Sequence, residues 1–122
     1  MGSREVGVVV SVRRPFTPPS EKAAIRLIID EAAEIFRVPA TGIIGLSRKQ
    51  HLVRARQAVC RVAYDQGWTS GEIGRRLAGR DPTTIHHARW QVDIHHPRDP
   101  SFAARFDRLA ARAAALKGKG YL

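Results

Sequence analysis

The sequence predicts an all-α fold: a compact bundle of about six helices that contains a helix-turn-helix and follows a short N-terminal arm. From Ser20 onward, apolar residues recur every three or four positions, as on the buried face of a helix. Residues that favour helix starts precede most of these stretches, and no segment between Ser20 and Leu122 has a strand pattern. At 122 residues the chain has room for one domain, which we place at residues 21–122.

Residues 1–20 form the predicted arm and linker. The run VGVVVSV at 6–12 is rich in β-branched residues, and Pro15, Pro18 and Pro19 follow it closely. Two interpretations remain open for this segment. It is either an edge strand with a linker, able to dock a partner, or a loose tail, because prolines near a chain end are common where nothing packs.

Capping residues, glycines and prolines delimit the predicted helices. Ser20 is expected to cap the first helix, and Thr41 to cap a short helical turn after Pro39. Asp99 followed by Pro100 is the start signal of the last helix. The expected helices are 21–37, 42–44, 53–66, 70–78, 82–94 and 100–118. An apolar stripe runs along the last helix from Phe102 to Ala113, and it is interpreted either as packing on the domain's own core or as docking a partner.

The fourth and fifth helices are predicted to be joined by a tight turn. Thr69 and Glu72 have the spacing of a capping box for the fourth helix, and Gly79 ends it. Asp81 followed by Pro82 is a start signal for the fifth, because proline suits the first helical position. Two helices with a glycine-containing turn between them predict a helix-turn-helix.

The chain has a formal net charge of +10, from 17 arginines and 4 lysines against 11 acids. No acid lies between Glu34 and Asp65, whereas six arginines and lysines do. Such a stretch repels itself unless something negative offsets it, although a solvated basic face is the simpler interpretation. Because arginine makes planar, forked contacts with phosphates and guanine edges, nucleic acid is the expected partner.

Other classes of protein are disfavoured by what the sequence lacks. No apolar stretch reaches the roughly 20 residues of a membrane span, so we expect no membrane partner. The single Cys60 forms no internal disulfide, which fits the cytoplasm. The five histidines lack the spacing of a metal site, and the acids are scattered. We therefore expect no metal, no cofactor and no enzymatic activity.

The segment GRDPTTIHHA at residues 79–88 resembles the hallmark of the C-terminal DNA-binding domain of the bacterial replication initiator DnaA, Gly-Arg-Asp-His-Thr-Thr-Val-Leu-His-Ala. LVRARQ at 52–57 is similar to the family's Val-Ala-Arg-Pro-Arg-Gln, and SGEIGRRLAGRD at 70–81 resembles its Leu-Pro-Glu-Ile-Gly-x-x-Phe-Gly-Gly-Arg-Asp. The resemblance spans about residues 25–116. It implies a helical bundle that binds double-stranded DNA as a monomer, with the helix-turn-helix in the major groove.

The resemblance also implies roles for individual residues. Arg54 would enter the minor groove, with Arg56 and Gln57 near phosphates, and Arg48 and Lys49 correspond to the family's basic loop. The recognition helix and the residues just before it supply the remaining predicted DNA-binding positions, which are Arg80, Asp81, Pro82, Thr83, Thr84, His86 and His87.

Three departures from the family pattern fall in the recognition helix. Pro82 stands where the family has a histidine near a base, and proline offers no hydrogen-bond donor. His86 replaces a leucine, and Trp90–Gln91 replaces a basic pair. We therefore hypothesise that the DNA sequence recognised is related to the family's box but differs at one or more bases.

The sequence contains no GxxxxGK[ST] phosphate loop, so it resembles the DNA-reading domain of the initiator without its ATPase. The resemblance includes regulators of phage-like genes and of gene transfer agents, which favours a bacterial transcription regulator at the nucleoid. A replication-control protein that competes for or assists at initiator boxes is one alternative. A protein-interaction module that recruits RNA polymerase or another partner is the other.

Overall fold

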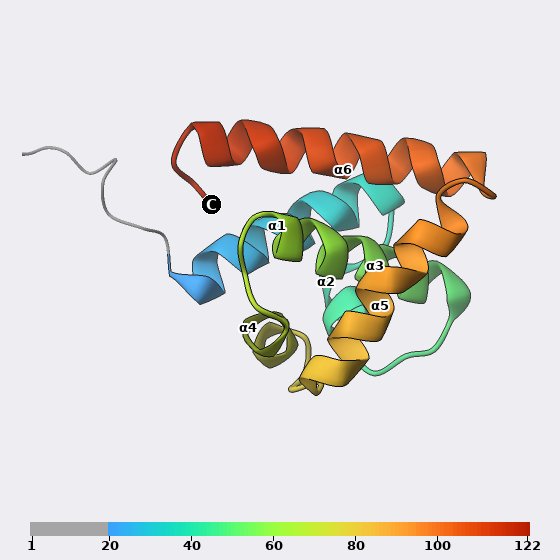
Figure 1. Cartoon of the computed structure of the whole chain (residues 1–122), viewed down its shortest axis with the longest axis horizontal. Helices are drawn as coiled ribbons and strands as arrows, with labels where there is room; N and C mark the ends of the chain where they lie inside the picture. The colour runs from blue at the N-terminus through green and yellow to red at the C-terminus, as the bar shows by residue number, and fades with distance from the viewer. Residues whose placement is uncertain (1–19) are drawn as a thin grey trace, which may run out of the picture.

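The computed structural model describes residues 20–122, and within that range the chain forms six helices and no strand (Figure 1). In chain order the helices are α1 (Glu21–Phe36), α2 (Ala40–Ile44), α3 (Gln50–Asp65), α4 (Ser70–Arg76), α5 (Pro82–His95) and α6 (Pro100–Gly118). The predicted all-α bundle is thereby confirmed. Apart from Ser20, the predicted arm lies outside the described residues.

Helix α3 is the centre of the bundle and packs against each of the other five helices. One helix can contact so many neighbours because small side chains occupy many of its inward positions. Ala55, Ala58 and Ala63 are completely buried, so the surrounding helices approach the α3 backbone closely. Larger apolar side chains of the other helices, such as Ile25 and Ile73, fill the rest of the core.

Helix α6 extends along the upper side of the bundle in Figure 1 and packs on α1 and α3. Phe102, Leu109 and Ala113 are at most 3% exposed, and the ring centroids of Phe102 and Phe36 lie 6.1 Å apart. The apolar stripe of α6 therefore packs on the domain's own core, which confirms that interpretation of the sequence.

Helices α2 and α3 begin differently from the prediction. Helix α2 starts directly after Pro39, so Thr41 lies within the helix and the prediction that it caps α2 is wrong. Helix α3 starts at Gln50, three residues earlier than expected. Its first turn is held because Leu52 is buried and lies beside Gly42 of α2, a tertiary contact that the local sequence does not signal.

The predicted caps of the other four helices are confirmed. Each capping side chain accepts a hydrogen bond from an amide in the first turn of its helix, and these side chains are Ser20, Thr69, Asp81 and Asp99. Glu72 completes the capping box of α4 by accepting a 2.8 Å hydrogen bond from the Thr69 amide. Helix α4 ends at Arg76, earlier than expected, because Ala78 and Gly79 have left-handed backbones with φ values of 59° and 70°.

Candidate nucleic-acid interface

The two helices of the helix-turn-helix, α4 and α5, approach each other closely at one glycine. A Cβ atom built on Gly74 would lie 2.0 Å from the backbone carbonyl oxygen of Arg80. Only a residue without a side chain permits this approach, so Gly74 lets α4 lie directly against the turn. Asp81, the next residue after Arg80, is the N-cap of α5. The contact between Gly74 and the Arg80 backbone therefore fixes the position of α5.

The first two turns of α5 present polar side chains to solvent. Asp81 caps the helix, and its Oδ1 accepts hydrogen bonds from the amides of Thr83 at 2.7 Å and Thr84 at 3.4 Å. Ile85 is fully buried, which anchors one side of the helix in the core. The predicted site residues in these two turns are all exposed, and they are Pro82, Thr83, Thr84, His86 and His87. This end of α5 thus offers hydroxyl and imidazole groups to a ligand.

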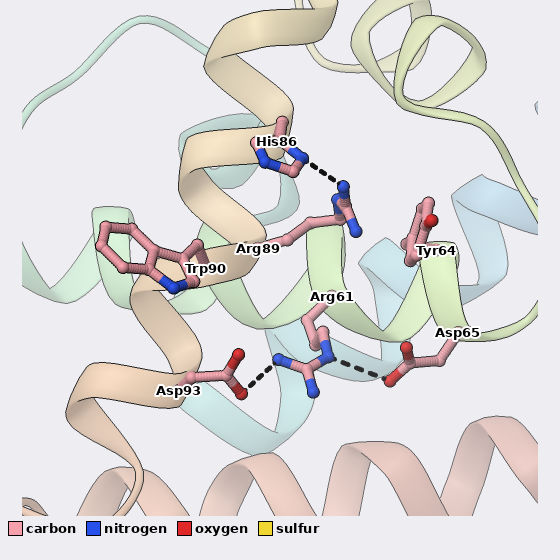
Figure 2. A pocket seen from close by; sticks show the side chains of 7 residues that line it. All are labelled: Arg61, Tyr64, Asp65, His86, Arg89, Trp90 and Asp93. Atoms are coloured by element: carbon pink, nitrogen blue, oxygen red, sulfur yellow. Dashed lines mark hydrogen bonds and ion pairs between the residues drawn. The ribbon is translucent and has the colours of Figure 1, made fainter.

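Figure 2 shows how one side of α5 is braced against α3. Arg61 of α3 donates hydrogen bonds to Asp93 of α5 at 2.6 Å and to Asp65 of its own helix at 3.3 Å. The hydrogen bond to Asp93, with the charges of both carboxylates, raises the pKa of Arg61. Arg61 therefore connects the central helix to the middle of α5.

A second arginine in this cluster orients a predicted site residue. The Arg89 guanidinium lies 3.5 Å from the ring centroid of Tyr64 and is hydrogen-bonded to Nδ1 of His86 (Figure 2). Tyr64 covers the Arg89 side chain and leaves it half-buried. Arg89 thereby restrains the His86 ring. The helical pattern missed this contact because Tyr64 belongs to a different helix.

On the opposite side of α5, the side chain of Gln91 contacts those of His87 and His95. Gln91 is half-buried and lies 3.1 Å from Nε2 of His87 and 3.1 Å from Nε2 of His95. Burial, together with the nearby charge of Arg54, lowers the pKa of His95. These contacts restrain the His87 ring, so both predicted site histidines of α5 are held by neighbouring side chains.

The basic loop, residues 45–49, joins α2 to α3. Arg48 and Lys49 are exposed, and the Lys49 amide donates a 3.2 Å hydrogen bond to the Ser47 hydroxyl. Arg54 lies one turn into α3 and is half-buried. In Figure 1 this loop and the first turn of α5 lie at the same, lower edge of the molecule.

Arg56 and Gln57, which were predicted near phosphates, are buried, with 8% and 9% of their surface exposed. Arg56 donates from Nε to the Ile43 carbonyl at 2.7 Å and from Nη2 to the Gly42 carbonyl at 2.9 Å. Burial lowers the pKa of Arg56. The Gln57 side-chain oxygen has no hydrogen-bond partner among the described residues. A phosphate contact by either residue stays a prediction.

The Arg80 side chain also turns toward backbone carbonyl groups. Its Nη1 donates to the carbonyls of Ile44 and Leu77, each at 2.9 Å, and its Nη2 donates to the carbonyl of Gly45. Burial lowers the pKa of Arg80. These bonds join the turn of the helix-turn-helix to the start of the basic loop.

The fold brings five of the predicted site residues together around one hollow of about 180 Å³ between α3 and α5. These residues are Arg56, Gln57, Arg80, Thr84 and His87. They come from α3, from the turn and from α5. The predicted residues in the basic loop and at the very start of α5 lie outside this hollow.

Residues 25–92 match the family described as the bacterial DnaA protein helix-turn-helix, which covers more than half of the chain. The chain belongs to this DnaA family. The matched range runs from α1 to the last turns of α5 and includes the basic loop, α3 and the helix-turn-helix. The DnaA helix-turn-helix is a DNA-binding domain, and the predicted contact residues all lie within it.

Several chromosomal replication initiator proteins DnaA are similar to this chain. The protein from Thermomicrobium roseum is 33% identical over 104 residues, which are 84% of this chain and 20% of the relative. The protein from Neisseria meningitidis is 29% identical over 84 residues, covering 68% of this chain and 16% of the relative. The protein from Cutibacterium acnes is 41% identical over 64 residues, covering 50% and 12%. The chain thus spans about a fifth or less of these DnaA relatives.

Two further observations concern the described part of this DnaA-family chain. Among residues 20–122, no helix is long and apolar enough to cross a membrane. In the same range, no group of three or more histidine, cysteine or acidic side chains is arranged to hold a metal ion.

Proposed function

We propose that this DnaA-family domain binds a specific double-stranded DNA sequence as a monomer. Helix α5 would enter the major groove, while Arg54 would reach the adjacent minor groove. The observation that supports this most directly is that the exposed first turns of α5 and the basic loop lie at the same edge of the molecule (Figure 1). A helix that reads bases needs phosphate contacts beside it to fix its register, and this edge offers both.

The exposed residues divide by the chemistry that they offer. We assign base contacts to the side chains of the first two turns of α5 and to Arg54, and phosphate contacts to Arg48 and Lys49. Thr83 and Thr84 each carry a hydroxyl and a methyl group, which can meet a base edge or a thymine methyl. His86 and His87 are restrained by Arg89 and Gln91, so less side-chain entropy is lost when they bind.

The binding assignments can be tested with three variants that each remove one positive charge. A binding selection from random duplexes first supplies the preferred sequence. Arg54→Ala is expected to reduce the preference for that sequence over random DNA by about 1–3 kcal/mol. Lys49→Ala is expected to weaken binding to all sequences and to lower the salt slope by about one unit. Arg108→Ala, on the exposed side of α6, is the matched control and should change neither quantity.

The contrary outcomes are equally specific. If Arg54→Ala leaves the ratio of specific to random binding unchanged, Arg54 does not read the minor groove. If the selection returns the unmodified DnaA box as the best site, the hypothesis that Pro82 and His86 alter the recognised sequence is wrong. If Arg108→Ala weakens binding as much as Lys49→Ala, binding depends on net charge and the proposed interface is misplaced.

For the cellular role we propose transcription regulation at the nucleoid, including regulation of phage-like or gene-transfer-agent genes. Replication control is the second candidate, because the similar relatives are named chromosomal replication initiators. Genome-wide binding measured together with expression separates the two. Binding at promoters with altered transcription supports regulation, whereas binding confined to the replication origin supports replication control.

A further inference from the structure

The turn of the helix-turn-helix and the basic loop are joined by one side chain. Arg80 lies in the turn, and its guanidinium donates to Leu77 in the same turn, to Ile44 at the end of α2 and to Gly45 at the start of the loop. Both Ile44 and Gly45 are more than 30 residues away in the sequence. The side chain is half-buried, and its hydrogen bonds point toward the protein.

The carbonyl groups of Ile44 and Gly45, to which Arg80 donates, lie at the end of α2, where carbonyls need donors from outside the helix. Helix α2 has only five residues, and the last four carbonyl groups of any helix lack hydrogen-bond donors within it. Arg56 takes the carbonyls of Gly42 and Ile43, and Arg80 takes the next two. Two arginines thus occupy four consecutive carbonyls, at the helix end where a positive charge is favourable.

The backbone of Arg80 is fixed as well. Its carbonyl oxygen lies against Gly74 so closely that a Cβ there would be 2.0 Å away. The next residue, Asp81, caps α5. A movement of the Arg80 backbone would therefore move both the start of α5 and the guanidinium that holds the loop.

We infer that Arg80 is a positioning residue that sets the basic loop, residues 45–49, at a fixed distance from the recognition helix α5. The inference rests on the proposed DNA binding. In this arrangement Lys49 reaches its phosphate because Arg80 holds the loop, and Arg80 itself does not contact DNA. The spacing between the residues that contact phosphates and those that contact bases is then already set before DNA binds.

The test on DNA is a double-mutant cycle. Lys49→Ala is measured in the wild-type protein and again in Arg80→Lys, which keeps the charge but lacks the forked group that reaches three carbonyls. If Arg80 positions the loop, we expect the loss caused by Lys49→Ala to shrink by about fivefold in the Arg80→Lys background. Arg54→Ala is the control, because Arg54 lies on α3 outside the loop, and its loss should be the same in both backgrounds.

A direct phosphate contact by Arg80 gives a different pattern. The effects of Arg80 and Lys49 substitutions would then add, and Arg80→Gln would lower the salt slope by about one unit even in the Lys49→Ala background. Either result overturns the inference. Additivity together with a lowered slope assigns Arg80 to the phosphates instead.

A second measurement does not depend on DNA binding. Amide hydrogen exchange in the free protein should become faster in Arg80→Lys at the two loop amides that donate hydrogen bonds, Gly45 and Lys49, while the amides of α3 and α6 keep their protection. Unchanged exchange in the loop would contradict the inference, and so would unfolding of both Arg80→Lys and Arg80→Gln, since Arg80 would then hold the whole fold. If exchange rises as expected but the wild-type protein itself does not bind DNA, the proposed function fails and the positioning contact stands.

Discussion

The contact between Gly74 and the turn gives the sharpest prediction about the helix-turn-helix. The variant is Gly74→Ala, which adds a single Cβ atom in the middle of α4. That atom would lie 2.0 Å from the Arg80 carbonyl oxygen and 3.1 Å from its carbon, whereas real Cβ atoms essentially never approach within 3.0 Å. The turn must therefore move by about 1 Å relative to α4.

Two opposing free-energy changes set the size of the effect. Replacing glycine by alanine inside a helix favours folding by about 1 kcal/mol. Forcing an extra carbon into a packed contact costs about 1–3 kcal/mol, and the cost here lies at or above the upper end because the obstacle is backbone that cannot rotate away. We expect a net loss of about 2 kcal/mol in the free energy of unfolding, or roughly 10 °C in the melting temperature.

The measurement is urea and thermal unfolding followed by circular dichroism, with an unchanged urea slope as the sign of the same native fold. Gly71→Ala is the matched control. It adds the same atom to the same helix, but there the nearest atom is 3.9 Å away, so its stability should equal or exceed that of the wild type. If Gly74→Ala is as stable as Gly71→Ala, the close approach of α4 to the turn does not exist.

Three other predictions concern single residues. Burial raises the pKa of Cys60 to about 12, so alkylation at pH 8 should proceed only at the rate of unfolding, and fast labelling of the native protein would show that the thiol is accessible. Asp81→Ala removes the cap of α5 and should cost about 1 kcal/mol by urea unfolding, with Asp81→Asn recovering most of it. Ala78→Gly relieves a left-handed backbone and should raise stability by up to about 1 kcal/mol, whereas Ala78→Val should lower it.

Much of the helical architecture was predictable because its signals are local. A capping side chain and its helix lie within four residues of each other, so Thr69 with Glu72, and Asp81 with Pro82, are visible in the sequence alone. The early start of α3 was not predictable. It depends on Leu52 packing beside Gly42, and no spacing rule connects those two residues.

The candidate site shows the same division. The resemblance singled out Arg56 and Arg80 as residues of the interface, but it carried no information about where their guanidinium groups point. Their direction depends on the carbonyls at the end of α2, which have no donors within that helix and which the fold brings next to α3 and to the turn. In the same way, the contact of Arg89 with Tyr64 arises only where α5 crosses α3.

The sequence by itself determined the class of fold, four of the helix caps, the family and the candidate residues of the DNA interface, because each of these is encoded in short patterns of neighbouring side chains. The tertiary structure alone decided which of the arginines face solvent and which hold the backbone. A cation satisfies its hydrogen bonds wherever acceptors lie within reach. Those acceptors, the carbonyls at the end of α2, come within reach of Arg56 and Arg80 only when the helices have packed.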